Sequence, residues 1–94
     1  MVVGVCTIQL EIFSNDSLKG KRSVVKPILT RVRDRFNVSA AEVDDLEAWQ
    51  RSTIAFACVS SDRDYAHGLL MKVVEFIEHS HFDANILDYQ IELI

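Results

Sequence analysis

The chain has 94 residues, of which 49% are hydrophobic and 26% charged, with three glycines and one proline, the composition of one globular domain over residues 1–94. Its formal net charge of −4 argues against a protein whose whole surface binds nucleic acid, but it allows a local basic patch. The N-terminal residues lack the basic start and long apolar run of a signal peptide, and no stretch approaches the ~20 apolar residues of a membrane span. We therefore expect a cytoplasmic protein with no membrane partner.

The first half of the chain predicts a strand, a helix and a second strand. Residues 2–13 alternate between apolar and mixed side chains, as in a strand with one buried face. Apolar residues recur every three or four positions over residues 18–36, which predicts an amphipathic helix. Pro27 lacks the N–H that a helix interior needs, so this helix either begins late, near Ser23, or kinks just before the proline. Residues 38–45 are more polar and suit an exposed edge strand.

The second half predicts a strand, a helix and a last strand. Residues 49–60 alternate as a third strand, and an amphipathic helix follows from an Asp62 N-cap to about Ser80. Residues 84–94 alternate again, with Ile86 on the face away from the core. The inward-facing side chains of this strand should be Leu87, Tyr89, Ile91 and Leu93. The order β-α-β-β-α-β predicts a ferredoxin-like, two-layer α+β sandwich, in which a four-stranded antiparallel sheet carries both helices on one face.

The first predicted helix is strongly basic. Seven of the ten lysine and arginine residues lie between positions 19 and 35, and on a helical wheel Arg31 and Arg35 lie on the opposite flank of the apolar stripe from most of the others. Either these side chains pair with the acidic residues that follow at 42–47, or they bind the phosphates of a nucleic acid. The candidate nucleic-acid-binding residues are Lys19, Lys21, Arg22, Lys26, Arg31, Arg33 and Arg35.

The predicted sheet has one face that no helix covers. Small and β-branched side chains there suit packing against another protein surface, so we expect a homodimer or a larger assembly. Glu11 and Arg51 should be cross-strand partners on this face. RNA-binding βαββαβ domains place aromatic rings at the centre of the same face, and none is expected here. The candidate interface residues are Val3, Val5, Thr7, Trp49, Arg51, Ala55, Ala57 and Val59.

No residue pattern in the chain indicates catalysis. Cys6 and Cys58 lie in apolar strands, where we expect reduced thiols that behave as small hydrophobic residues. His79 and His81 give only a weak metal signal, because histidines are common near a helix C-terminus. Glycine-rich phosphate loops and nucleophile motifs are absent. We therefore expect no enzymatic activity, no cofactor and no metal.

The run SLKGKR at residues 17–22 resembles the S-L-K-x-K-R signature of the bacterial YlxP-like family, a family of unknown function, and further matches cover almost the whole chain. The resemblance implies a ferredoxin-like fold in the cytoplasm of a bacterium, and it supplies no catalytic residues. Family members are often encoded beside genes for translation initiation and ribosome maturation. Gly20 departs from the helix-favouring residue often found there, which weakens a capping box from Ser17. The matching motif positions include Lys19, Lys21, Arg22, Phe36, Asn37, Ser39, Glu42 and Trp49.

The sequence thus supports two main functional interpretations. The first is a non-enzymatic accessory protein that binds RNA or a ribosomal particle through its basic first helix. The second is a protein-interaction or scaffold module that dimerises through the open sheet face. Phosphate binding weakens steeply with salt and apolar packing does not, so salt dependence separates them. A small-ligand regulatory domain is supported by fold analogy alone.

Overall fold

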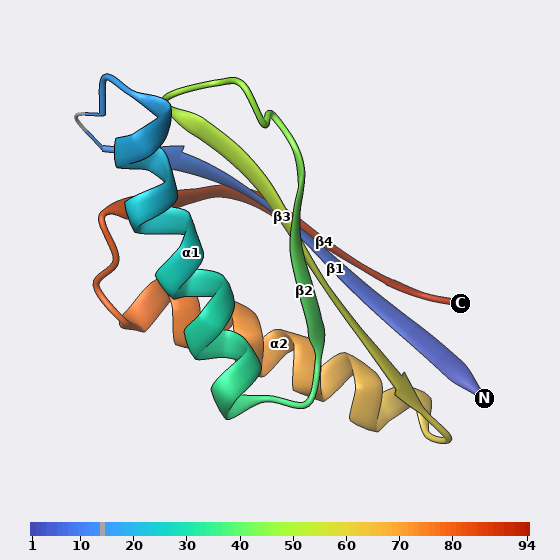
Figure 1. The fold of residues 1–94 in the computed structure, drawn as a ribbon. Coiled ribbons are helices and arrows are strands. Elements are labelled where there is room, and N and C mark those ends of the chain that lie inside the picture. The colour runs from blue at the N-terminus through green and yellow to red at the C-terminus, as the bar shows by residue number, and fades with distance from the viewer. Residues whose placement is uncertain (14) are drawn as a thin grey trace.

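The computed structural model describes residues 1–13 and 15–94. Strand β1 spans Val2–Ile12, helix α1 Leu18–Arg35, strand β2 Ser39–Asp44, strand β3 Arg51–Ser60, helix α2 Arg63–His79 and strand β4 Ala84–Leu93. The strands form one antiparallel sheet in the order β2-β3-β1-β4. Both helices lie on the same side of this sheet (Figure 1), which confirms the predicted ferredoxin-like α+β sandwich.

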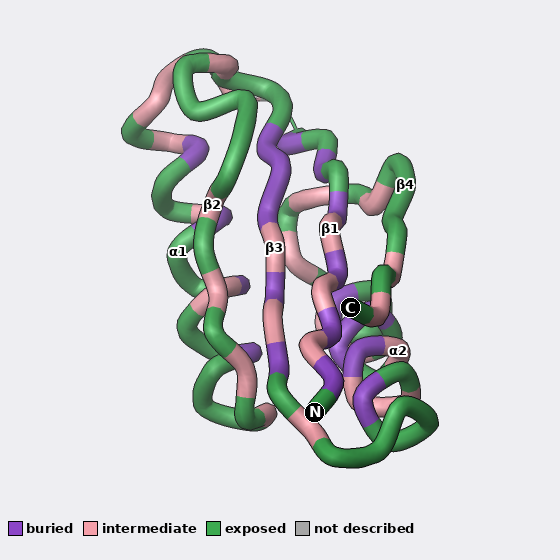
Figure 2. The backbone as a smooth tube through the Cα atoms, turned by 90° about the vertical axis from the view of Figure 1, so that its right-hand side faces the viewer, coloured by how far each residue is buried: buried purple, intermediate pink, exposed green. Residues whose placement is uncertain are grey.

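The core lies between the sheet and the two helices. Alternate residues of β1 are buried and their neighbours are partly exposed, as the period-two pattern predicts, and Figure 2 shows this alternation along β1 and β3. Ile8 and Phe56 are fully buried from the sheet side, and Ile28 and Leu70 meet them from the helices. Strands β2 and β4 form the two edges of the sheet, as expected for the polar segment at residues 38–45.

Helix α1 starts early and runs through Pro27 without interruption, so the late start near Ser23 is wrong. The Ser17 hydroxyl accepts a hydrogen bond from the Gly20 N–H at 2.9 Å and thereby caps the first turn. A Cβ at Gly20 would overlap Asn15 Oδ1, so a glycine fits this turn where a larger residue does not. The hydrogen bond that Pro27 removes is offset by the burial of Val25 and other apolar residues on both sides of it.

The first half of strand β4 presents its side chains to the opposite faces from those predicted. The pairing of β1 with β4 shifts by one residue between Gln9 and Leu10, so that Ile86 lies opposite Leu10 and packs against the core. Leu87 is the additional residue of this irregularity and is exposed rather than buried. Tyr89 lies opposite the buried Ile8, and its hydroxyl lies 4.0 Å from the Met71 sulfur of α2, so it faces the helices as predicted although it is 39% exposed. Ile91 and Leu93 pack against the core as predicted.

Candidate nucleic-acid interface

The basic residues of α1 are divided between two flanks of the helix, as the helical wheel predicts. On the first flank, Arg33 donates a hydrogen bond from Nη1 to the Ala40 carbonyl of β2 at 3.3 Å. On the second flank, the Arg31 guanidinium lies over the ring of Phe76 in α2. The first flank, which we call the cationic row, is formed by Lys19, Arg22, Lys26 and Arg33.

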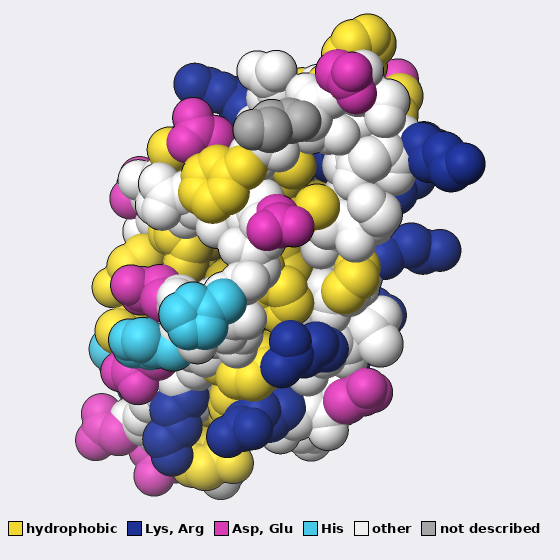
Figure 3. Space-filling model, turned by 90° about the vertical axis from the view of Figure 1, so that its left-hand side faces the viewer, with side chains coloured by type: hydrophobic (Ala, Val, Ile, Leu, Met, Phe, Trp, Pro, Cys, Tyr) yellow, Lys and Arg dark blue, Asp and Glu magenta, His cyan; other side chains and the backbone are white. Residues whose placement is uncertain are grey.

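All four side chains of the cationic row are exposed. With a rise of 1.5 Å per residue, Lys19 and Arg33 are separated by about 21 Å along the helix axis. Figure 3 shows Lys and Arg side chains along one side of the helical face, while many of the Asp and Glu side chains lie on the other side. The row therefore presents a line of positive charge on a chain that is acidic as a whole.

Lys21 was predicted from the sequence to contact phosphates, but it does not belong to this exposed surface. Its side chain is only 1% exposed, and its Nζ lies 3.0 Å from Glu42 Oε2. The same ammonium donates to the backbone carbonyls of Asp45, Leu46 and Arg51 at 2.8, 3.1 and 3.3 Å. It occupies this position because it projects from the buried side of α1, toward the loop between β2 and β3. The burial removes Lys21 from the candidate phosphate contacts.

The acidic hairpin was the alternative partner for the whole basic segment, and it pairs with Lys21. Within residues 1–13 and 15–94, Lys21–Glu42 is the one ion pair with a separation of 4 Å or less. Glu42 also accepts a hydrogen bond from the Ser52 hydroxyl at 2.7 Å, and Asp45 accepts one from the Thr53 hydroxyl at 2.8 Å. Glu42 and Asp45 are thus engaged inside the molecule, and no carboxylate of the described residues forms an ion pair with the cationic row.

The second basic flank faces a cluster of aromatic rings. The Arg31 guanidinium carbon lies 5.4 Å from the ring centroid of Phe76 and 5.1 Å from that of Phe82. The Arg35 guanidinium carbon lies 5.2 Å from the Phe76 centroid. Phe36 meets Phe76 edge to face, with 5.8 Å between centroids. These distances are those of cation–π contacts, which hold the guanidinium groups over the rings.

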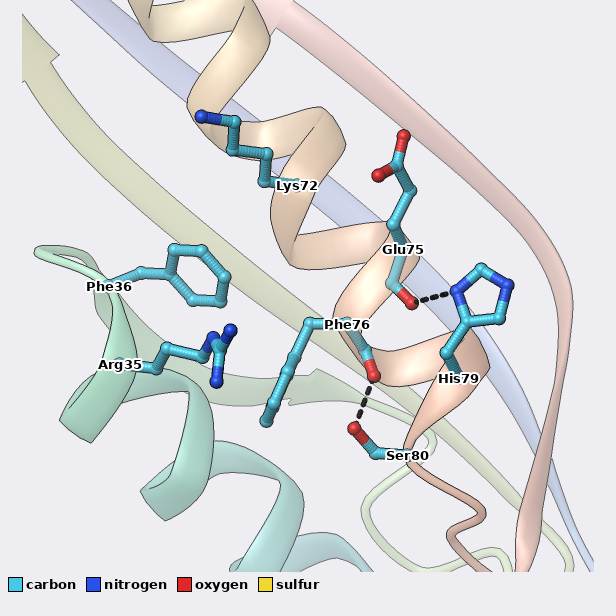
Figure 4. A pocket seen from close by; sticks show the side chains of 7 residues that line it. All are labelled: Arg35, Phe36, Lys72, Glu75, Phe76, His79 and Ser80. Carbon is cyan, nitrogen blue, oxygen red and sulfur yellow. Dashed lines mark hydrogen bonds between the residues drawn. The ribbon is translucent and has the colours of Figure 1, made fainter.

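Beside this cluster lies a hollow of about 400 Å³ between the C-terminal halves of the helices, which we call the α1–α2 groove (Figure 4). The Arg35 side chain reaches from α1 toward Phe76. At the end of α2, His79 Nδ1 lies 2.9 Å from the Glu75 carbonyl oxygen, which orients the imidazole. The groove is lined by Arg35, Phe36, Lys72, Glu75, Phe76, His79 and Ser80.

Sequence reasoning identified the arginines of this region but not their partners in α2. Phe76 lies on the apolar face of α2 and is half-buried, so it packs against the core and still presents its ring to the arginines. Lys72 lies outside the basic segment, and His79 showed only a weak metal signal in the sequence, so neither residue was predicted to line a groove. The available signal was the four-residue spacing of Arg31 and Arg35, which places both on the flank that faces the second helix.

The candidate interface residues on the strands share the open face, as predicted. The register pairs Val3 with Val59, Val5 with Ala57 and Thr7 with Ala55 across β1 and β3. Val59 is 70% exposed, and Glu11 lies directly opposite Arg51, which confirms their expected pairing. Trp49 belongs to the loop before β3 and is 52% exposed.

Within the described residues, the cysteines and the candidate metal ligands show no sign of a reactive site. Cys6 and Cys58 are free, buried thiols, and burial raises the pKa of Cys6 to about 11. Across residues 1–13 and 15–94, no three His, Cys, Asp or Glu side chains gather as they would around a metal ion. Neither α1 nor α2 is apolar enough over its length to cross a membrane.

Comparison with known proteins places the chain in a family. The model of the family described as "Protein of unknown function (DUF503)" matches residues 3–91. The chain is also similar to "Uncharacterized protein YlxP" of Bacillus subtilis (strain 168), with 40% identity over 77 residues, which covers 82% of this chain and 84% of the relative. The match to the family model, over residues 3–91, includes the cationic row, the groove and the open sheet face. The chain therefore belongs to the DUF503 family, and its YlxP-like character agrees with the motifs at residues 17–22.

Proposed function

We propose that this protein is a non-enzymatic accessory protein of the cytoplasm. It would bind RNA, either free or in a ribosomal particle, and its cationic row would contact the RNA phosphates. The observation that carries the proposal is the row itself. Lys19, Arg22 and Lys26 are exposed along one flank of α1, and no carboxylate of the described residues lies within ion-pair distance of them. Free cations arranged in a line suit a ligand whose negative charges are also arranged in a line.

The mode of binding differs from that of RNA-binding βαββαβ domains, which stack bases on the open sheet. Here the centre of that face carries Val5, Thr7, Ala55 and Ala57, which offer no ring for stacking. We therefore assign the phosphate contacts to the helical layer. Such contacts position RNA without reading its sequence, so binding by the row alone should show little sequence preference.

Charge reversal on the row tests the proposal. Arg22→Glu and Lys26→Glu, made singly and together, should weaken binding of a labelled RNA progressively at low salt, by at least tenfold for the pair. Arg63→Glu is a matched control, because Arg63 is an exposed arginine near the start of the other helix and its replacement changes the net charge by the same amount as Arg22→Glu. Equal loss of affinity in Arg22→Glu and Arg63→Glu would show that only net charge matters and would refute a localised row.

The open sheet face favours a second candidate function, self-association in a scaffold module. Four strands of 6 to 11 residues, spaced at about 4.8 Å with about 3.3 Å per residue, cover roughly 600 Å². Two such faces would bury about 1,200 Å², which lies at the lower limit for a specific interface and predicts a weak dimer. The apolar end of the face, with Val3, Val5 and Val59, would form the contact.

Sedimentation equilibrium at several protein concentrations tests this second candidate. Val59→Asp should shift a dimer toward the monomer, because it introduces a charge on the exposed apolar end of the face. Tyr65→Asp is the control, since Tyr65 is an exposed apolar side chain on the helical layer. A parent protein that remains monomeric at tens of micromolar, where even a weak specific dimer would be populated, would remove this candidate.

A further inference from the structure

We propose that the α1–α2 groove binds one unpaired nucleotide of an RNA strand, and this inference rests on the RNA binding proposed for the cationic row. The nucleotide's phosphate would lie against Arg35, with Lys72 of the same lining and Arg31 of an adjoining hollow adding positive charge, and its base would stack on the guanidinium and ring surfaces of the groove. Duplex RNA offers no free base, so the groove would make the protein prefer single-stranded regions.

Two cations, Arg35 and Lys72, line the groove, and a third, Arg31, lines a hollow that adjoins it and shares Arg35. Arg31 and Arg35 come from the last turns of α1, and Lys72 comes from the middle of α2. The carboxylates nearest to them along the lining are Asp34 and Glu75, and neither forms an ion pair in the part of the chain that the structure describes. The N–H groups of both guanidiniums therefore have no carboxylate partner, which leaves donors for phosphate oxygens.

The guanidinium groups of Arg31 and Arg35 are held in place before any ligand arrives. Each lies 5.1 to 5.4 Å from the centroid of a phenylalanine ring, and Arg31 contacts the rings of both Phe76 and Phe82. An arginine that rests on an aromatic ring loses less side-chain entropy on binding than a mobile lysine does. A base can stack on the outer face of such a guanidinium or on a neighbouring ring, as in known recognition of single-stranded RNA.

The groove has a suitable size for a nucleotide. Its volume of about 400 Å³ falls within the range of roughly 300–1,000 Å³ for ligand sites. An adjoining hollow of about 380 Å³ shares Arg35 and Phe76 with it, so that the strand could continue past the bound nucleotide.

The groove and the cationic row meet at the C-terminal end of α1. Arg33 belongs to the row and Arg35 to the groove, and a two-residue step along the helix advances only about 3 Å. A strand whose phosphates follow the row from Lys19 to Arg33 would therefore reach the groove by turning around the last turn of the helix. The row would supply affinity and the groove would supply the preference for unpaired nucleotides.

Paired substitutions of arginine by lysine test the inference. Arg35→Lys keeps the charge but removes the planar group that rests on Phe76, whereas Arg33→Lys makes the same chemical change on the opposite flank. Affinities are measured for a labelled oligoadenylate, for a duplex RNA of the same length and for adenosine monophosphate. Arg35→Lys should weaken oligoadenylate binding roughly tenfold, which is the effect of losing one stacked base. It should leave duplex binding unchanged, and Arg33→Lys should affect both RNAs alike.

Each other outcome contradicts a defined part of the argument. If Arg22→Glu weakens RNA binding but Arg35→Lys does not alter the single-strand preference, the groove proposal fails and the proposed function stands. If adenosine monophosphate binds as tightly as oligoadenylate, the groove takes a free nucleotide and its assignment to a strand is wrong. If the parent protein binds neither RNA, both proposals fail. In NMR spectra of the oligoadenylate complex, ribose and base protons should show contacts with the ring protons of Phe36 or Phe76, and their absence would also overturn the groove proposal.

Discussion

Replacement of Lys21 by methionine should destabilise the fold more than the same replacement of any other lysine or arginine in the basic segment. The variant leaves the Glu42 carboxylate without its cation and leaves the carbonyls of Asp45, Leu46 and Arg51 without their shared donor. Breaking a buried ion pair by removing one partner costs about 3–5 kcal/mol. The Glu42 side chain retains 16% exposure and keeps its hydrogen bond from Ser52, so we expect the lower end, about 3 kcal/mol.

Urea denaturation followed by circular dichroism measures this loss. With a slope of about 1–3 kcal/mol per molar, the unfolding midpoint should fall by roughly 1–3 M. Lys19→Met is the matched control, because Lys19 is exposed on the same helix, and its midpoint should change little. In a Glu42→Gln background, Lys21→Met should cost at least about 1 kcal/mol less, since the two charges are coupled. Equal midpoints for Lys21→Met and Lys19→Met would refute the assigned role of Lys21.

Two further predictions concern backbone freedom and a buried thiol. Gly68→Ala should raise the free energy of unfolding by roughly 0.5–1 kcal/mol, because a Cβ there meets open space within a helix. Gly20→Ala should not raise it, because its Cβ would displace the Asn15 amide. Thermal unfolding compares the two variants directly, and equal stabilisation would contradict the Asn15 contact. Cys6 has a folded-state pKa of about 11, above the value of 9.0 for a free thiol, so its contribution to stability is full below pH 9 and is lost as the pH rises to 11. The free energy of unfolding should therefore fall by up to about 1.4 kcal/mol per pH unit in that window, and Cys6→Ala should flatten this slope.

The features of the fold that follow from local periodicity could be predicted from the sequence. The alternation in β1, the apolar stripes of both helices and the Asp62 cap of α2 depend on neighbouring residues, and the structure confirms each of them. The facing of β4 could not be predicted in the same way. Its irregularity arises where β4 pairs with β1 at Gln9 and Leu10. The sequence of β4 alone does not indicate where this pairing shifts.

The features of the candidate site that depend on tertiary contacts were harder to predict. In the sequence, Lys21 does not differ from the other basic residues of the segment. It is buried because the loop between β2 and β3 packs over it and supplies carbonyl acceptors. The sequence predicted a helix over residues 18–36 but left its start open, because Pro27 is a strong local signal and the contacts of Asn15 with Ser17 and Trp49 are not. The α1–α2 groove requires two helices to pack at a particular rotation, which brings Arg35 over Phe76.

The salt dependence of RNA affinity tests most directly whether the cationic row contacts phosphates. For single-stranded RNA, each phosphate contact contributes about 0.7 to the slope of the logarithm of affinity against the logarithm of salt concentration. The triple variant Lys19→Gln, Arg22→Gln and Lys26→Gln should therefore have a slope about 2 units shallower than the parent protein. A parent protein that binds RNA with the same slope as the triple variant would contradict the account, because the phosphates would then be contacted elsewhere.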